Sequence, residues 1–217
     1  MLFRSLLLVL ASATLLYGNL GAIPQRNIKR LLGYSSIGHA GYMLMGIAAA
    51  NNLGVSAVLF YLGQYAFTNL CGFLAIIAVT NATGSDEISE FAGLHKRSPI
   101  LALALFIAML SLAGVPPLSG FFAKFQLFAA VIERAATDSR YYALAAIGAA
   151  AVVISLYFYL NVAKAIYIQE AEDESPIHVS GPMRAALYVC MIAVIGLGIY
   201  QRPLVDAARI AARVFGL

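Results

Sequence analysis

The sequence contains little charge. Asp, Glu, Lys and Arg make up 11% of its 217 residues, whereas hydrophobic residues make up 62%. Soluble globular domains contain about a quarter charged residues, so this composition cannot supply a water-facing surface of ordinary area. We therefore expect the lipid bilayer to cover much of the outside of the protein. The net charge of +4 is small and spread along the chain, which gives no basic footprint for nucleic acid.

Cofactor motifs are also missing. The two cysteines, Cys71 and Cys190, lie in separate apolar segments without a CxxC spacing or a histidine partner. This pattern excludes a cysteine-based cluster, zinc site or disulfide framework. The sequence has no GxGxxG, P-loop or HExxH motif, so nucleotide, flavin and zinc chemistry have no visible place. We expect no cofactor and no metal to bind in this chain.

Long apolar runs dominate the chain instead. A transmembrane helix needs about 20 mostly apolar residues, because the hydrocarbon core is about 30 Å thick. Short connections without a linker predict one transmembrane domain, residues 1–217, with an all-α fold: a polytopic membrane helix bundle. The six segments that qualify are 3–23, 33–50, 55–80, 99–132, 141–168 and 183–201.

The first segment begins like a cleavable secretory signal, but its apolar run continues to Ile23 and ends before basic residues, which favours a spanning helix. The tail 203–217 mixes arginine and aspartate with alanine and aliphatic residues, which is typical of an interfacial helix. Basic residues are divided almost equally between the two sides, so the positive-inside rule does not decide the orientation.

Segment 99–132 is too long for a straight span, because 34 helical residues would extend about 51 Å. Its middle contains Pro116 and Pro117 between Gly114 and Gly120. Two prolines remove two backbone donors and disrupt the preceding turn. We therefore predict a helix broken near 114–120. The freed carbonyls must face protein or a wet cavity.

Lys124 follows this break among several phenylalanines. A lysine at membrane depth costs at least about 2.5 kcal/mol on insertion scales, and desolvation makes such an amine able to gain and lose a proton when a neighbouring charge changes. Broken helices with ionisable residues near the bilayer midplane recur in ion transporters. We therefore interpret Lys124 as the proton-handling residue. The alternative is two short helices with Lys124 reaching an interface.

Polar side chains form stripes on three other segments, with the spacing of one helix face. Such stripes could line a hydrated proton path, or they could form interhelical hydrogen bonds that hold the bundle together. The three stripes comprise Ser35, His39 and Tyr42; Tyr61, Gln64, Tyr65 and Thr68; and Tyr157, Asn161 and Lys164.

Two of these residues are ionisable near the expected path. His39 is the second candidate for proton transfer, because the ordinary pKa of histidine lies near neutrality; the alternative is a buried neutral ring held by a neighbour. Lys164 lies close to the end of its segment, so its amine can instead snorkel to the membrane surface. The candidate path therefore comprises Lys124 first, then His39, Tyr61, Tyr65 and Lys164.

Two long stretches resemble a known family. The sequence NIKRLLGYSSIGHAGY at 27–42 and the sequence LSLAGVPPLSGFFAKF at 110–125 resemble motifs of the antiporter-like membrane subunits of proton-pumping NADH–quinone oxidoreductase, respiratory complex I. The tyrosine-rich LYFYL at 156–160 also looks similar. Among the paralogues, the wording SSIGHAGY and the short C-terminus look most like subunit N.

This resemblance implies several properties. Full-length relatives have fourteen helices with two inverted five-helix repeats, and this chain is similar to the second repeat plus the final helix. Lys124 would be the broken-helix lysine of the second half-channel, and the loops holding Arg26–Arg30 and Lys96–Arg97 would be cytoplasmic. The chain would be a non-redox translocation subunit in the bacterial inner membrane, while partner subunits of complex I would use NADH and quinone.

One departure from the family pattern is serious, because the charged residues of the first repeat have no counterpart here. A separate chain would then supply the first repeat, or the chain is a truncated product. Three functions remain open: a proton-translocating subunit of complex I, a component of a multi-subunit cation/proton antiporter, and a structural fragment without transport.

Overall fold

The computed structural model describes residues 2–171 and 173–213, apart from the side chains of the first two and the last of these. In the described residues all regular secondary structure is helical, with one isolated bridge between Asn27 and Glu87. The helices are α1 (Leu2–Ala22), α2 (Ile28–Ala49), α3 (Asn52–Thr83), the 3-10 helix η1 (Ile88–Phe91), α4 (Leu94–Arg97), α5 (Pro99–Ala113), α6 (Ser119–Ala135), α7 (Arg140–Tyr167), α8 (Gly181–Ile199) and α9 (Arg202–Arg213).

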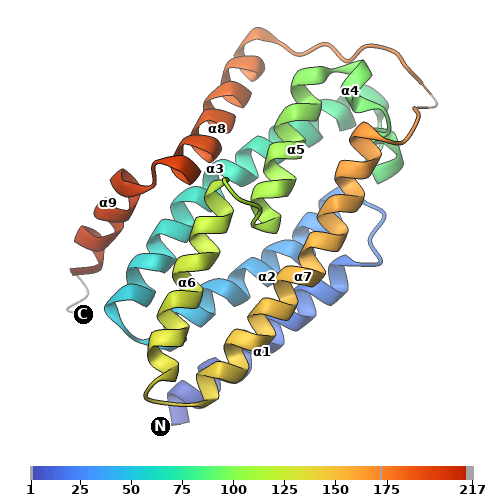
Figure 1. Ribbon diagram of the computed structural model, residues 1–217. Helices are drawn as coiled ribbons and strands as arrows, with labels where there is room; N and C mark the ends of the chain where they lie inside the picture. The colour runs from blue at the N-terminus through green and yellow to red at the C-terminus, as the bar shows by residue number, and fades with distance from the viewer. Residues whose placement is uncertain (1, 172, 214–217) are drawn as a thin grey trace.

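The long helices run side by side as a bundle (Figure 1). At one end, which we call the Arg97 end, α2, α5 and α8 begin and α3 and α7 finish; the Ile177 amide bonds the Arg97 carbonyl there at 3.0 Å. At the opposite end, the Asn51 end, the side-chain amide of Asn51 donates to the Ala130 carbonyl of α6 at 3.1 Å. At each end, one of these hydrogen bonds ties a connection to a neighbouring helix.

Among the described residues, four helices are long and apolar enough to cross a membrane: α1 from Arg4, α3, α7 and α8. Helix α5 is apolar but shorter. Helices α2 and α6 are not in this set, although both lie within the bundle. Their buried faces carry polar residues such as His39 and Lys124, which lowers their hydropathy. The all-helical membrane bundle predicted from composition is confirmed.

The expected break in segment 99–132 is also confirmed. Helix α5 ends at Ala113, and Gly114 adopts the left-handed conformation with φ 89° that residues other than glycine avoid. The Gly114 amide caps the helix by bonding the carbonyls of Leu110 and Ser111. Helix α6 starts at Ser119, beyond the two prolines. The break therefore lies about 22 Å from the start of α5, whereas α7 is about 42 Å long, which places it near mid-bundle.

The end of α8 packs against this break. A Cβ on Gly198 would overlap the Pro117 carbonyl oxygen, so only a glycine permits the contact. Helix α9 then continues beside α3, toward the Asn51 end (Figure 1). Its apolar side chains Val205 and Ala208 are buried there. The expected interfacial tail, 203–217, thus corresponds largely to α9; its last four positions lie outside the described residues.

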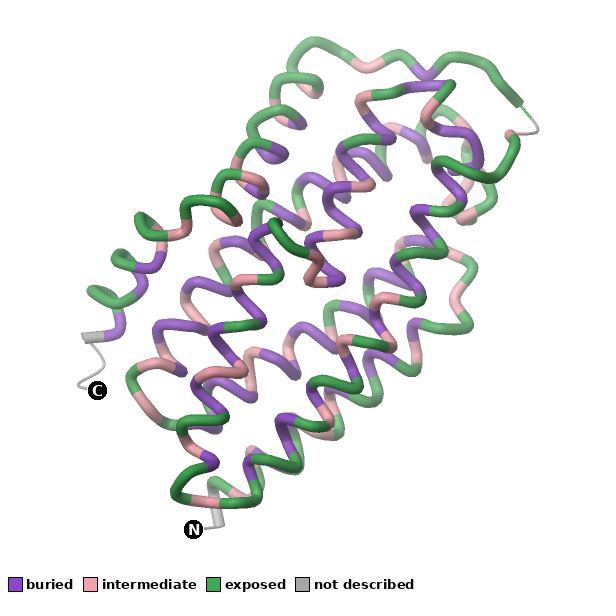
Figure 2. The backbone as a smooth tube through the Cα atoms, viewed as in Figure 1, coloured by how far each residue is buried: buried purple, intermediate pink, exposed green. Residues whose placement is uncertain are grey.

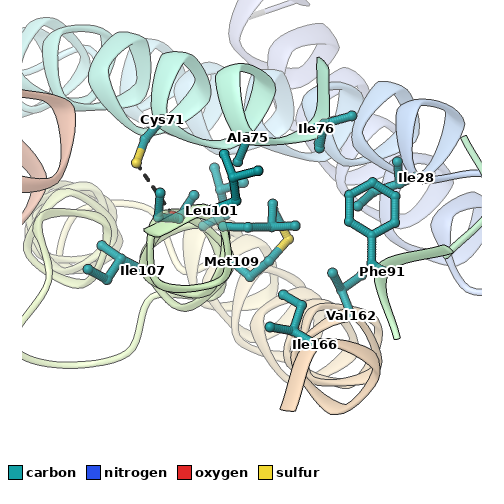
Figure 3. Close-up of a cluster of buried hydrophobic side chains, with 14 of the residues drawn as sticks. Ile28, Cys71, Ala75, Ile76, Phe91, Leu101, Ile107, Met109, Val162 and Ile166 are labelled. Carbon is teal, nitrogen blue, oxygen red and sulfur yellow. Dashed lines mark hydrogen bonds between the residues drawn. The ribbon is translucent and has the colours of Figure 1, made fainter. Parts of the chain in front are cut away.

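Two apolar clusters are stacked along the bundle. The cluster toward the Arg97 end joins α3, α5 and α7 around Phe91 and Met109 (Figure 3). The cluster toward the Asn51 end joins α1, α2, α3, α6 and α7 around Tyr42 and Leu127. Along α3, the first cluster begins at Cys71 and the second ends at Tyr61. A layer of buried polar side chains separates them. Figure 2 shows the buried positions running through the bundle interior.

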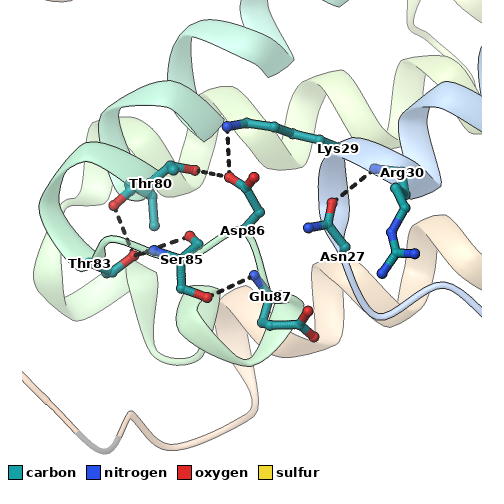
Figure 4. Close-up of polar contacts among 9 residues, drawn as sticks. Asn27, Lys29, Arg30, Thr80, Thr83, Ser85, Asp86 and Glu87 are labelled. Carbon is teal, nitrogen blue, oxygen red and sulfur yellow. Dashed lines mark hydrogen bonds and ion pairs between the residues drawn. The ribbon is translucent and has the colours of Figure 1, made fainter.

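The Arg97 end is fixed by polar contacts outside the apolar clusters (Figure 4). Lys29 at the start of α2 pairs with Asp86 after α3, at 2.7 Å. The hydroxyl of Thr80 donates to the same carboxylate oxygen of Asp86 at 2.7 Å. The Ile28 amide also bonds the Asp86 carbonyl at 2.8 Å. These contacts hold α2 and α3 in a fixed relation at the Arg97 end of the bundle.

Candidate functional site

Lys124 is the central residue of the polar layer. It lies in the second turn of α6 and is 4% exposed. Long helical side chains extend toward the N-terminus of their helix, which here points the amine back at the end of α5. Its Nζ donates to the Leu112 carbonyl at 2.8 Å and to the Ala113 carbonyl at 2.9 Å. The predicted need to satisfy carbonyls at the break is therefore met by the lysine itself.

These two bonds favour a positive charge on the amine. The last carbonyls of a helix carry a partial negative charge from the aligned peptide dipoles, and both Leu112 and Ala113 belong to the last turn of α5. Within the described residues no carboxylate forms an ion pair with Lys124. The Tyr42 ring lies below the amine, with its centroid 4.9 Å from Nζ. Dipoles and an aromatic face thus replace a counter-ion.

The two half-helices overlap closely beside Lys124. A Cβ on Gly120 would overlap the carbonyl oxygen of Ser111, so the first turn of α6 lies directly against the last turn of α5. The Gly120 amide donates to the Ser111 hydroxyl at 3.2 Å. This contact fixes the position of α6 relative to α5, and hence the reach of Lys124.

A hydroxyl cluster from α3, α5 and α6 surrounds this contact. The Gln64 side-chain oxygen accepts from the hydroxyls of Thr68 and Ser119, each at 3.2 Å. The Ser111 hydroxyl lies 3.3 Å from that of Thr68 and 3.4 Å from that of Ser119. All four side chains are buried. Part of the predicted α3 stripe therefore faces the break.

A second hydrogen-bonded chain centres on His39 in α2. Its Nδ1 lies 2.5 Å from the Tyr61 hydroxyl of α3, and its Nε2 lies 3.0 Å from the Tyr159 hydroxyl of α7. The Tyr159 hydroxyl also bonds the hydroxyl of Ser35, one turn before His39. All four side chains are buried. A neutral imidazole donates through one nitrogen and accepts through the other, so the ring can pass a proton between the two tyrosines.

Tyr42 joins the two groups in space. Its ring lies 6.3 Å from the His39 ring, centroid to centroid, and it also faces the Lys124 amine. The Tyr65 ring lies 4.9 Å from that of His39 on another side. The structure therefore brings together four of the predicted path residues: Lys124, His39, Tyr61 and Tyr65.

The fifth predicted residue, Lys164, lies elsewhere. The stripe of Tyr157, Asn161 and Lys164 is on the exposed face of α7, with Tyr157 57% exposed. These side chains line a groove between α5 and α7 on the outside of the bundle. Polarity and spacing indicated that these three side chains share one face of α7, but not whether that face points into the bundle or away from it. The placement matches the alternative in which Lys164 reaches the membrane surface.

Tyr159 is the residue that the stripe pattern missed. It lies in the LYFYL stretch at 156–160, which carries part of the family resemblance. However, it does not have the helical spacing that joins Tyr157, Asn161 and Lys164 in the α7 stripe. Its hydroxyl nevertheless contacts both Ser35 and His39. The LYFYL stretch could have identified it, because tyrosines two residues apart in a helix lie on different faces, so that one of them points away from the stripe.

The described residues offer little for a metal ion. No group of three or more His, Cys, Asp or Glu side chains lies together in that part of the chain. Cys71 and Cys190 are both buried and unpaired with each other. The Cys71 thiol donates instead to the Ala104 carbonyl at 3.4 Å. The two cysteines thus pack within the apolar cluster.

Comparison with solved structures supports the arrangement. One chain of respiratory complex I from Thermus thermophilus with bound aureothin matches with a TM-score of 0.76 and 32% identity, over 94% of this chain and 45% of that chain. A chain of the membrane-bound sulfane sulfur reductase, an archaeal respiratory membrane complex, matches with a TM-score of 0.87 and 27% identity, over 97% and 42%.

Sequence comparison points the same way. NADH-quinone oxidoreductase subunit N of Desulforamulus reducens is 43% identical over 97% of this chain and 43% of its own length. The chain thus spans less than half of the length of this curated relative. The family model described as "NADH:quinone oxidoreductase/Mrp antiporter, TM" matches residues 2–155. The protein is a multi-pass membrane protein, and it belongs to the NADH:quinone oxidoreductase/Mrp antiporter transmembrane family.

Proposed function

We propose that this chain is part of the proton-translocating membrane machinery of a respiratory NADH–quinone oxidoreductase, with Lys124 as its titrating residue. The observation that carries the proposal is the buried amine of Lys124, held by the last carbonyls of α5 at a break in mid-bundle. A buried amine that has no carboxylate partner among the described residues changes its charge when a neighbouring charge changes. The relatives support the choice of complex.

The proposed path has two hydrogen-bonded parts. One is the contact of Lys124 with the α5 carbonyls, and the other runs from Ser35 through Tyr159 and His39 to Tyr61. Water in the polar layer around Tyr42 would join them during transport. A proton leaving Lys124 would then reach His39, and the ring would relay it between the tyrosine hydroxyls.

The proposal assigns the redox chemistry to other chains. Partner subunits would bind NADH and quinone, and quinone reduction there would drive the charge changes felt by Lys124. Other membrane subunits would complete the transmembrane path. The bacterial relatives favour the plasma membrane as the location.

The test uses the assembled complex in proteoliposomes. NADH oxidation and proton uptake are measured together for the wild type, Lys124→Ala and the matched control Lys96→Ala, whose lysine is exposed at the Arg97 end. We expect Lys124→Ala to lower the protons pumped per NADH at least severalfold, while Lys96→Ala keeps the wild-type ratio. A native gel with every band identified shows assembly. Undiminished pumping by assembled Lys124→Ala would contradict the proposal.

The family also contains Mrp antiporters, so the second function is cation/proton exchange. The same vesicles distinguish it: an imposed sodium gradient would move protons without NADH, and that movement would depend on Lys124. Sodium-driven movement without redox partners on the native gel would replace the first proposal with this one.

A further inference from the structure

A groove opens on the outside of the bundle at the Arg97 end, between α5 and α8 and the connection that precedes α8. Its volume is about 520 Å³. None of the buried proton-path residues lines it. The groove is therefore separate from the proposed transport site, and it lies where two helices enter the bundle.

The outer part of the groove is cationic and polar. Arg184, in the first turn of α8, and His178 both line it and are exposed. The side chain of Ser180 does not cap α8, so the positive end of this helix adds to the field beside Arg184. Arg97 also lines the groove, but its guanidinium already donates to backbone carbonyls and is buried. Arg184 is the cation that can turn to a ligand.

Nearby carboxylates are engaged elsewhere. Glu174 pairs with Lys96 at 3.3 Å, and Asp173 lies 4.0 Å from the Arg97 guanidinium. In the part of the chain that the structure describes, no aspartate or glutamate lines the groove. Its outer part therefore favours a negatively charged group.

The inner part of the groove is apolar. Ile100, Leu103 and Val179 line it, and Tyr188 lies beside Arg184 on α8, half exposed. A tyrosine between apolar and cationic side chains is typical of the membrane–water interface. The groove therefore changes from cationic to apolar along its length, as a phospholipid does from phosphate to acyl chain.

Leu103 extends the apolar part further. It also lines the larger groove between α5 and α7, whose volume is about 730 Å³. That groove is almost entirely apolar, and Lys164 lines it together with Asn161. The two grooves thus meet on the outer face of α5, and together they offer a continuous apolar track for acyl chains.

We propose that this surface binds an anionic phospholipid of the surrounding bilayer. Arg184 and His178 hold its phosphate, and an acyl chain lies along Ile100 and Leu103 into the groove between α5 and α7. Charge complementarity selects the anionic headgroup, and the apolar track selects a lipid over free phosphate. The site would attach one lipid at the end of the bundle from which α5 leads to the broken junction.

The experiment is native mass spectrometry of the purified full chain in micelles containing phosphatidylglycerol or phosphatidylcholine. The wild type should retain phosphatidylglycerol preferentially. Arg184→Gln should reduce this preference about fivefold, the effect of one cation near an anionic membrane surface. Arg30→Gln is the matched control, because Arg30 is exposed at the same end but outside the groove, and it should keep the wild-type preference.

A second pair of variants tests the apolar track. Leu103→Gln should weaken retention of both lipids, whereas Leu62→Gln on α3 should not, although the two leucines are 45% and 46% exposed. Inorganic phosphate added in excess should not displace the lipid. Equal retention of the two lipids by the wild type, or an unchanged preference in Arg184→Gln, would overturn the proposal.

Discussion

The Nζ of Lys124 lies 2.8 Å from the carbonyl oxygen of Leu112, across the junction between two half-helices. The residue proposed to carry the proton is thus also the residue that caps α5. Under the proposed function, a change at this position acts on both stability and transport, so the two must be measured separately.

Lys124→Met is expected to separate them. The change removes two hydrogen bonds from a charged donor, about 1.5–3 kcal/mol each, and also removes the burial of an amine, a penalty of at least about 2.5 kcal/mol. These effects partly offset each other and leave a net loss of about 0.5–3.5 kcal/mol, so the unfolding temperature in detergent should fall by less than about 14 °C. Proton pumping should still be lost. A much larger loss of thermal stability would show that Lys124 is mainly structural.

Gly120→Ala is expected to destabilise the junction strongly. Its new Cβ would overlap the Ser111 carbonyl oxygen, and backbone atoms cannot move aside without separating α5 from α6. We expect a loss of at least about 3 kcal/mol, at the upper end of overpacking effects. Gly33→Ala in α2 is the control, because nothing lies within 4 Å of its added Cβ; it should stabilise by about 0.5–1 kcal/mol. Thermal unfolding followed by circular dichroism compares the two, and similar behaviour would contradict the packing.

Tyr159→Phe is expected to interrupt the His39 relay. The change removes the hydroxyl that contacts Ser35 and His39 but keeps the ring. We expect proton pumping to fall about tenfold or more, within the range contributed by one positioned proton-transfer group. Tyr157→Phe, two residues away on the exposed face, should pump normally. The ratio of protons to NADH in proteoliposomes reports both, and equal ratios would remove Tyr159 from the path.

Asp86→Asn is expected to change the acid stability of the Arg97 end. The hydrogen bond from Lys29, with a second from Thr80, lowers the pKa of the Asp86 carboxyl below its ordinary value of 3.8. Because the folded pKa is the lower one, the stabilisation is present above pH 3.8 and is lost as the pH falls through the folded pKa. Thermal unfolding at pH 6 and at pH 3 should differ less in Asp86→Asn than in the wild type.

Glu87→Gln provides the control for this pH effect, because Glu87 is the next residue and its side chain lies apart from Lys29 (Figure 4). Its acid dependence should match that of the wild type. If Asp86→Asn and the wild type lose the same stability between the two pH values, the ion pair does not contribute to acid sensitivity.

The sequence predicted the break and the lysine because both depend on local chemistry. Two successive prolines in a helix interior remove two backbone donors and disrupt the preceding turn whatever the fold, and a lysine in an apolar run is conspicuous in any fold. The direction in which a polar stripe faces depends on neighbouring helices instead. Tyr157 and Tyr159 are two residues apart, and only packing against α2 decides which of them is buried.

Two other features could not be predicted for the same reason. The capping of Leu112 by Lys124 requires α6 to start beside the last turn of α5. Gly120 permits this close approach, but a glycine in the sequence does not predict it. The groove around Arg184 arises because the connection before α8 is held against Arg97. Long-range contacts of this kind leave no spacing pattern in the chain.

Because Lys124 caps α5, the strength of the junction between α5 and α6 depends on whether the amine is protonated. A protonated amine bonds the two carbonyls roughly twice as strongly as a neutral one, so discharging it loosens the connection between the half-helices without breaking it. Proton loss would therefore make the bundle easier to deform at its middle, close to Pro117 and the end of α8. A partner subunit bound to α8 would then respond to the charge of Lys124 without contacting it.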